Sequence, residues 1–392
     1  MSKIESLRAR QILNSRGDWT IEVTVRASGG VEANASVPQG ESRGSHEAVS
    51  LPADQAIKNI LEIIGPVLKE SECVDQAQLD ARLIELDGTA TKERLGGNAL
   101  LGVSMAYARL MALSENLPLW QYLRNISGLE LNSPTPPRLL ALMVEGGLHA
   151  PGASPFQEYL VLPRGLAITQ SIDIVTRIYQ SLRQIVSERF GPAATRLGDE
   201  GAFAPPTTQP LEPFNLIIAA GQAVGLAETF DVGLDAAANN TPFTAEELMI
   251  YYRQMRSTYP LCYLEDPFKE DDFIHSASFL AESNKEMMIV GDDLTVTNIE
   301  RMKIAQAERS VNAMIIKPNQ IGTVTETLKA ARQARRYGWR ITVSHRGQET
   351  NDDFIADLAW GIGADGIKLG APTRGERVSK YNRLLEIAAQ NR

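Results

Sequence analysis

The segment Leu261-Cys-Tyr-Leu-Glu265 is a short apolar run of β-strand length that ends in a single acid. Five more runs in the second half of the chain have the same form, and a segment of helix length follows each. They are Val232 to Asp235, Met288 to Asp292, Ala313 to Lys317, Ile341 to Ser344 and Gly366 to Lys368. The ends of the six runs are 30, 27, 25, 27 and 24 residues apart, close to the roughly 30 residues of one unit when about 250 residues form eight βα units. The spacing predicts a parallel β/α barrel.

The first third of the chain has a different pattern. Residues 20–37 alternate between apolar and polar as a β-hairpin does. Helical patterns follow around residues 45–70, 75–86 and 98–115. Strands followed by helices indicate an α+β domain, and Ser133-Pro-Thr-Pro-Pro137 then interrupts all periodicity as a linker does. We therefore predict an α/β protein with an N-terminal α+β capping domain at residues 1–127 and a β/α barrel at residues 138–392.

Composition excludes several classes of function. The formal charge of −9 and the lack of a dense basic run argue against a nucleic-acid binder. Cys73 and Cys262 are too few for a disulfide framework or a zinc cluster, and we expect both to be reduced and buried. Residues 1–9 lack the apolar core of a signal peptide, and no stretch has the length of a membrane span. We expect a soluble, cytoplasmic protein without a membrane partner.

Three acids at the ends of successive runs predict a metal site. In β/α barrels the chemistry lies at the C-terminal ends of the strands, so Asp235, Glu265 and Asp292 should point at one spot. Ligands that offer only oxygen suit a hard cation such as Mg²⁺. A single acid at a strand end is more often a helix cap or a solvated loop residue. Three in register, followed by Lys317, favour the metal site.

Two lysines and two further acids could move protons. Lys317 and Lys368 each close an apolar run, where a nearby divalent cation would disfavour the ammonium form and make a better general base; a surface lysine is the alternative for each. Glu200 and Glu158 lie near predicted strand ends, and His149 precedes Glu158 by nine residues. Two facing acids repel, so one tends to hold a proton and can serve as a general acid.

These residues stand in an order that resembles the enolases (phosphopyruvate hydratases) from Ala9 to Leu385. The matching segments are Ser15 to Gly17, Val37 to Ala48, Glu85 to Thr89, Asn98 to Ser104, Gly146 to His149, Gly198 to Pro205, Leu264 to Pro267, Gly291 to Asn298, Lys317 to Thr323, Ser344 to Arg346 and Lys368 to Pro372. The resemblance implies an enolase-type cap and barrel. It also implies a glycolytic hydro-lyase that reversibly dehydrates 2-phosphoglycerate to phosphoenolpyruvate through an enediolate.

The resemblance also implies catalytic roles. Lys317 would remove the proton α to the substrate carboxylate, and Glu200 would protonate the departing hydroxyl with Glu158 and His149 nearby. The resemblance also implies the general scheme of the enolase superfamily, in which a Lys or His base acts with one or two Mg²⁺ ions that stabilise the ene-diolate.

Ligand sets are implied in the same way. Two Mg²⁺ ions are expected for each active site. Asp235, Glu265 and Asp292 would hold the first, and Ser42 would help hold the second, between its loop and the phosphate. The substrate would contact Arg346 through its phosphate and Lys368 through its carboxylate. Gln157, His345 and Ser42 complete the expected substrate-binding set.

The chain departs from the family pattern near the substrate. The loop that usually reads Pro-Ser-Gly-Ala-Ser-Thr-Gly is Pro38 to Gly44 here and carries Glu41 and Arg43. Gly347 stands where the family has Ser, and Glu145 stands where it usually has Asn. Two alternatives follow: a divergent enolase paralogue acting on a related phospho- or phosphono-carboxylate, and a catalytically silent scaffold homologue.

Family dimers pair charges between the N-terminal strands and the last helix. Here Glu22 would face Glu386, and Arg10 would face Ala389. We therefore expect a homo-oligomer, a dimer or larger, in which these usual ion pairs are not retained.

Overall fold

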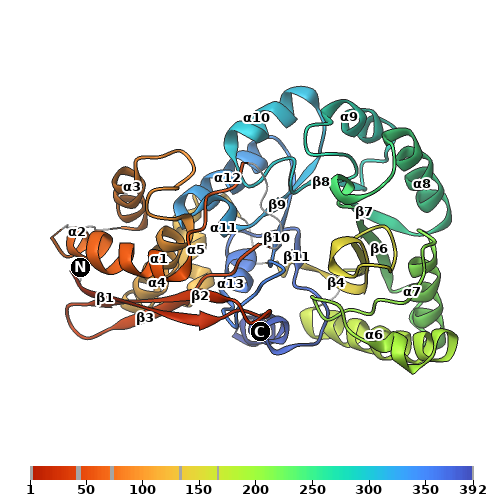
Figure 1. The fold of residues 1–392 in the computed structure, drawn as a ribbon, viewed down its shortest axis with the longest axis horizontal. Helices are drawn as coiled ribbons and strands as arrows, with labels where there is room; N and C mark the ends of the chain where they lie inside the picture. Colours follow the sequence, from red (N-terminus) through yellow and green to blue (C-terminus); the bar gives the residue numbers. More distant parts are fainter. Residues whose placement is uncertain (1–2, 41–45, 71–74, 132–134, 166, 391–392) are drawn as a thin grey trace.

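The structure, a computed structural model, describes residues 3–40, 46–70, 75–131, 135–165 and 167–390. Among these residues the N-terminal part forms a three-stranded sheet covered by helices, and the part beyond residue 137 forms a closed barrel of eight strands (Figure 1). The predicted fold class, a capping α+β part followed by a β/α barrel, is confirmed.

The capping sheet is antiparallel and has the order β1-β2-β3. Its strands are β1 (Ile4–Leu13), β2 (Trp19–Ala27) and β3 (Glu32–Ser36). The predicted hairpin is confirmed, with Val23 opposite Ala35. Strand β1 was not predicted from the sequence. A register irregularity between Ile4 and Ser6 breaks its period of two, and only Ile4 and Leu7 of this strand are buried.

Five α-helices complete the described part of the cap. They are α1 (Ala53–Asn59), α2 (Gly65–Glu70), α3 (Gln76–Asp87), α4 (Gly97–Ser114) and α5 (Leu119–Ser127). The helical pattern predicted from residue 45 begins only at Ala53, after Pro52 at its N-cap, and a π-helical turn joins α1 to α2 at Ile60–Ile64. Helix α4 packs on the sheet, because Gly102 lets the helix backbone approach Val23.

The barrel closes in the order β10-β11-β4-β5-β6-β7-β8-β9. Its strands are β4 (Arg138–Glu145), β5 (Glu158–Pro163), β6 (Phe230–Asp235), β7 (Leu261–Glu265), β8 (Met288–Gly291), β9 (Ala313–Ile316), β10 (Arg340–Ser344) and β11 (Gly366–Lys368). The six runs found in the sequence are six of these strands. The expectation of an all-parallel barrel was wrong, because β5 runs antiparallel to both β4 and β6. A hairpin connection replaces one βα unit, so the regular spacing could not reveal it.

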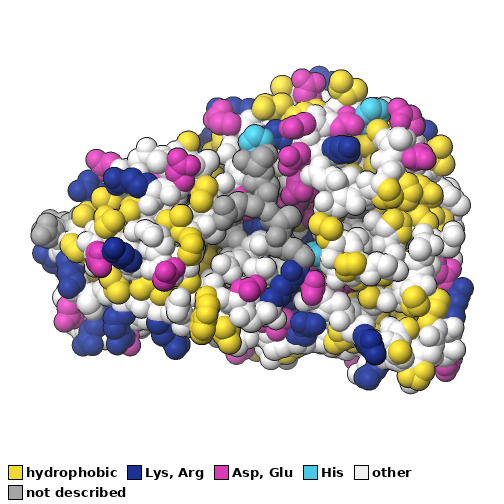
Figure 2. Space-filling view, viewed as in Figure 1, with side chains coloured by type: hydrophobic (Ala, Val, Ile, Leu, Met, Phe, Trp, Pro, Cys, Tyr) yellow, Lys and Arg dark blue, Asp and Glu magenta, His cyan; other side chains and the backbone are white. Residues whose placement is uncertain are grey.

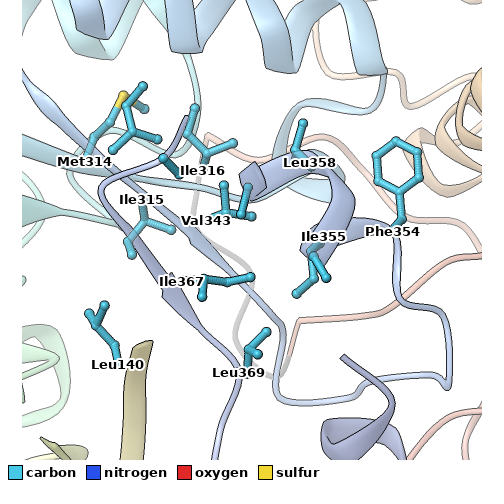
Figure 3. Packing of buried hydrophobic residues seen from close by; sticks show 14 of the residues in the cluster. Leu140, Met314, Ile315, Ile316, Val343, Phe354, Ile355, Leu358, Ile367 and Leu369 are labelled. Atoms are coloured by element: carbon cyan, nitrogen blue, oxygen red, sulfur yellow. The ribbon is translucent and has the colours of Figure 1, made fainter. Parts of the chain in front are cut away.

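Helices surround the barrel (Figure 1). They are α6 (Ile168–Phe190), α7 (Glu212–Ala223), α8 (Ala245–Thr258), α9 (Phe273–Glu282), α10 (Ile299–Glu308), α11 (Pro318–Ile321), α12 (Val324–Arg336), α13 (Phe354–Gly361) and α14 (Gly375–Gln390). Figure 3 shows Ile355 and Leu358 of α13 on the side of β10 and β11, toward Val343 and Ile367. All four of these side chains are buried, so an apolar layer fixes the strand ends that carry the polar residues.

The cap and the barrel meet at α5 and α13. A Cβ added at Gly361 of α13 would lie 2.6 Å from the backbone oxygen of Trp120 and 3.1 Å from Cβ of Leu123. Near this contact, Arg109 of α4 donates to Asp352 at 2.6 Å and to Asp353 at 2.8 Å. The two parts are therefore joined by backbone-level packing and by charged hydrogen bonds.

We predict that Gly361→Ala destabilises the protein despite the helix propensity of alanine. The substitution gains about 1 kcal/mol of propensity, but the backbone of α5 cannot move aside cheaply, and overpacking costs roughly 1–3 kcal/mol. Urea unfolding followed by circular dichroism should show a lower midpoint. Gly375→Ala is the control, because the nearest atom to its added Cβ is Oδ1 of Asn351 at 3.9 Å. Equal midpoints for the two variants would contradict the prediction.

Candidate active site

The C-terminal ends of the parallel strands surround one polar pocket. Because β5 is antiparallel, its first residue, Glu158, lies at the same end of the barrel as the last residues of β6 and β7. Glu158 is in register with Asp235, and Asp235 with Glu265. On the face seen in Figure 2, Asp and Glu side chains gather at the junction between the cap and the barrel.

Most of the predicted site residues line this pocket. They are Lys317, Glu200, Glu158, His149, Arg346, Lys368, Gln157, His345, Asp235 and Asp292. Glu265 does not line it and is fully buried. Ser42 and Arg43 lie outside the described residues. Glu200 belongs to a loop between α6 and α7 and not, as expected, to a strand end.

Lys368, the last residue of β11, is buried among three acids. Its Nζ donates to Asp235 at 2.8 Å and to both oxygens of Glu265 at 2.9 Å, and it lies 3.1 Å from Glu158. Burial alone would lower the pKa of Lys368, but Asp235, Glu158 and Glu265 raise it well above its usual value. Lys368 is therefore a fixed cation in this structure and not a surface lysine.

Lys317 follows β9 and forms an ion pair with Asp292, which follows β8. Burial acts to lower the pKa of Lys317, yet the charge of Asp292 outweighs burial and raises it. The ammonium form is thus favoured here, opposite to the expectation for a lysine beside a bound divalent cation. Asp292 is also held by Nε2 of Gln320 at 3.0 Å, and its backbone N–H donates to Asp266 at 2.9 Å.

Glu158 and Glu200 form a carboxylate pair with His149. One carboxylate oxygen of each acid and a ring nitrogen of His149 lie within 4.8 Å of one another. Burial raises the pKa of Glu158 well above its usual value, with Glu200 adding to the effect. Burial also acts to raise the pKa of Glu200, but His345 and His149 outweigh it and hold that pKa well below the usual range. The pair therefore keeps one proton on Glu158 in this structure.

Arg346 lies at the cap side of the pocket. Its guanidinium donates to Glu47 at 3.0 and 3.2 Å and to Oδ1 of Asn319 at 3.0 Å. Arg346 and Glu47 are both buried. This arrangement fixes the planar fork of an arginine at the edge of a pocket, which suits bidentate binding of a phosphate or carboxylate.

The donor chemistry of the pocket fits magnesium. Asp235, Glu265 and Asp292 are buried and offer only oxygen, and burial, then Asp235, raises the pKa of Glu265 to about 8. Asp266, Asp292 and Asp293 also bring carboxylate oxygens within 4.8 Å of one another. The predicted trio is divided here, because Asp235 and Glu265 bind Lys368 whereas Asp292 binds Lys317. A hard cation would neutralise the negative charge of these buried carboxylates.

Sequence reasoning missed the residues that support this site. Asp266 accepts hydrogen bonds from the backbone N–H groups of Asp292 and Asp293 at 2.9 Å each. It directly follows Glu265, so its only signal was a second acid at a strand end. Glu47 lies within the enolase-like segment, but nothing in a single sequence indicates that it pairs with Arg346 from the other part of the chain.

Comparison with known proteins agrees with this geometry. Residues 4–123 match the family model "Enolase, N-terminal domain", and residues 135–242 and 238–391 match "Enolase, C-terminal TIM barrel domain". The chain is 40% identical to Enolase B of Dictyostelium discoideum over 98% of this chain and 94% of the relative. It is 38% identical to the enolase of Methanopyrus kandleri (99% and 96%) and 37% identical to that of Solanum lycopersicum (99% and 95%). The chain belongs to the enolase family. The resemblance seen in the sequence is thereby confirmed.

Among the described residues of this enolase homologue, we find no helix that combines the length and the apolar character needed to cross a bilayer.

Glu145 is fully buried at the end of β4. Its Oε1 accepts from the backbone N–H groups of Glu200 at 3.0 Å and Ala202 at 2.7 Å. Its Oε2 has no hydrogen-bond partner among the described residues and lies against Gly198, where any Cβ would clash with it. Burial, then the charge of Glu200, raises the pKa of Glu145 to about 8.

We predict that Glu145→Gln makes stability less dependent on pH. A carboxyl whose pKa is raised by folding from 4.5 to about 8 stabilises the native state below the unfolded pKa, and this contribution is lost as the pH rises through 8. Each pKa unit corresponds to about 1.4 kcal/mol. The amide stays neutral, and its oxygen still accepts from the backbone N–H of Glu200. The free energy of unfolding of the variant, relative to the parent protein, should therefore increase from about pH 4.5 to about pH 8 and then level off.

Urea unfolding of both proteins across this pH range measures the effect. Glu188→Gln removes an exposed carboxylate of α6 and serves as the control, with no such growth expected. A constant difference between Glu145→Gln and the parent protein at all pH values would contradict the prediction.

Proposed function

We propose that this protein is a Mg²⁺-dependent enolase that reversibly dehydrates 2-phosphoglycerate to phosphoenolpyruvate. Its membership in the enolase family supports this reaction over a divergent substrate and over a silent scaffold. The structural observation that carries the proposal is the placement of proton-handling groups on opposite sides of one pocket.

Lys317 and the carboxylate pair face each other across the barrel. In the ring of eight strands, β9 and β5 are separated by three strands in either direction. Lys317 follows β9, and Glu158 begins β5. A substrate held between them has its α-proton on the side of one group and its leaving hydroxyl on the side of the other. This geometry suits an elimination in which base and acid act on opposite faces.

The proposed roles follow from this placement. Lys317 takes the proton α to the carboxylate, and Glu200 delivers a proton to the departing hydroxyl from the pair that it forms with Glu158. His149 lies within 4.8 Å of both acids and supports their shared proton. Gln157 and His345 line the same pocket and contact the substrate.

Charge stabilisation is the second requirement, because removal of the α-proton leaves a carboxylate dianion. Lys368 is held as a cation at the pocket wall and faces the substrate carboxylate. Asp235, Glu265 and Asp292 would hold Mg²⁺, which would supply Lewis-acid stabilisation of that carboxylate. Arg346 binds the phosphate. Ser42, which lies outside the described residues, would help to hold a second ion.

The remaining expectations are proposals of the same kind. Helix α5 ends at Ser127 and strand β4 begins at Arg138, which supports a division into residues 1–127 and 138–392. We propose a cytoplasmic dimer or larger homo-oligomer. Arg10 pairs with Glu22 of its own chain at 2.7 Å, which supports the expectation that the usual ion pairs between subunits are not retained.

We predict Mg²⁺-dependent formation of phosphoenolpyruvate from 2-phosphoglycerate, measured by absorbance of the enol phosphate. Lys317→Ala should lose roughly 100-fold or more in both turnover and exchange of the α-proton with heavy water. Glu200→Gln should lose turnover but retain exchange, because the base acts before the acid. Lys285→Ala, an exposed lysine at the opposite end of the barrel near the start of β8, is the control.

The outcomes separate the candidate functions. Exchange without product in the parent protein would mean that the enolising half works on a different substrate. If the parent protein gave neither exchange nor product with Mg²⁺ present, the proposed enolase function would be refuted and a scaffold role would replace it. Full activity of Lys317→Ala would refute the base assignment.

We predict that Mg²⁺ raises the midpoint of thermal unfolding, because a ligand that binds only the folded state stabilises it by about 2.7 kcal/mol at 100 times its Kd. Asp235→Asn removes one proposed ligand and should shift the Mg²⁺ concentration needed for stabilisation upward by about tenfold or more. Glu188→Gln again serves as a surface control. An unchanged Mg²⁺ dependence in Asp235→Asn would contradict the ligand assignment.

A further inference from the structure

Arg377 is a fully buried arginine that neither the sequence motifs nor the proposed chemistry includes. It lies in the first turns of α14, with no exposed surface. Among the described residues its nearest carboxylate is Glu376, with Nε of Arg377 3.8 Å from that acid. Burying a guanidinium costs several kcal/mol unless its N–H groups are well used. The positions of its donors therefore indicate its purpose.

The guanidinium donates to neutral acceptors behind the pocket. Nη1 lies 2.5 Å from Nδ1 of His345 and 2.6 Å from the backbone oxygen of Arg346. Nη2 lies 2.7 Å from the backbone oxygen of Gly347. The side of His345 that faces away from the substrate is thus occupied by a cation.

This contact determines where His345 carries its proton. A guanidinium can only donate hydrogen bonds, so Nδ1 of His345 must be the acceptor. A neutral imidazole has one N–H, which then lies on Nε2. Nε2 is 3.2 Å from Oε2 of Glu200. The imidazole N–H therefore lies on the side of the ring nearest to the carboxylate that we assign as the acid.

We propose that Arg377 is a positioning residue that holds His345 in the tautomer protonated on Nε2 and so keeps a neutral N–H donor beside Glu200. The inference rests on the proposed function of Glu200. With the opposite tautomer, the lone pair of Nε2 would face the carboxylate, and His345 would compete for the proton that the Glu158–Glu200 pair shares.

The surroundings of His345 keep it neutral. The charged groups that face it are Glu200 of the 198–201 loop, Arg377 of α14 and Glu349, which follows it in the chain. Burial, together with Arg377, lowers the pKa of His345 to about 4 against the opposing effect of Glu200. Gly370 permits this crowding, because a Cβ there would lie 3.1 Å from both His345 and Arg377 and 3.0 Å from the backbone oxygen of Glu200.

The tautomer can be read directly by NMR. The chain has four histidines, so ¹⁵N-histidine labelling of the full-length protein in Mg²⁺ buffer gives a simple spectrum, and His345→Gln identifies the His345 signals. We expect a protonated Nε2 and an unprotonated Nδ1 that persist between about pH 5.5 and 8. A protonated Nδ1, or an imidazolium in this range, would overturn the proposal even if no variant folds.

Two variants test whether Arg377 is the cause. Arg377→Met removes every donor, so His345 should lose its fixed tautomer and titrate at a higher pH. Arg377→Lys keeps a charged donor and should restore the Nε2 tautomer, although it cannot replace all three hydrogen bonds. We expect kcat of Arg377→Met to fall about tenfold or more, with a larger loss at lower pH and a smaller change in KM, and partial recovery in Arg377→Lys.

A matched control separates positioning from general stability. Arg383 also lies in α14, where its guanidinium donates to Asp357 at 2.7 and 2.8 Å and not to His345. Arg383→Met should destabilise the helix but leave the tautomer unchanged. An unchanged tautomer and pH profile in Arg377→Met would overturn the proposal. Lack of turnover with 2-phosphoglycerate would instead count against the proposed function, because the tautomer is measured without substrate.

Discussion

The arrangement of the barrel mouth depends on one constraint, which is that the buried cation Lys368 must be met by opposite charges. Lys368 of β11 is buried with Glu158, Asp235 and Glu265, which come from β5, β6 and β7. Strands β11 and β7 are on opposite sides of the ring, so this contact spans the barrel mouth. An unpaired charge there would cost several kcal/mol. The ends of the strands are consequently held in one geometry by electrostatics as well as by backbone hydrogen bonds.

The antiparallel strand β5 provides one of the acids that meet Lys368. In an all-parallel barrel, the first residue of a strand lies at the end opposite the active site. Reversing β5 brings its first residue, Glu158, to the mouth, in register with Asp235. The hairpin between β4 and β5 also carries His149 and Gln157 over the pocket. One reversed connection thereby supplies three of the polar groups that face Lys317.

The sequence predicted the parts of the fold that repeat. Six strand ends followed from a regular spacing, and the acids and lysines that close them do meet in the structure. The reversal of β5 was not predictable, because apolar strands read the same in both directions. The partners Glu47 and Arg377 were not predictable either. Each reaches its partner, Arg346 or His345, across a long stretch of chain, and no local pattern encodes such a contact.

Glu145 and Gly347 both contact neighbouring segments through backbone groups. Glu145 binds the N–H groups of Glu200 and Ala202. Gly347 offers its carbonyl to Ser15 at 3.3 Å and to Arg377 at 2.7 Å. A change of substrate would require that the groups facing the pocket move or change their charge. Here Glu145 supports the loop that carries Glu200, whereas Gly347 lines the pocket and adds no side chain to it. Lys317, Arg346 and Lys368 line the same pocket, which is consistent with the enolase reaction.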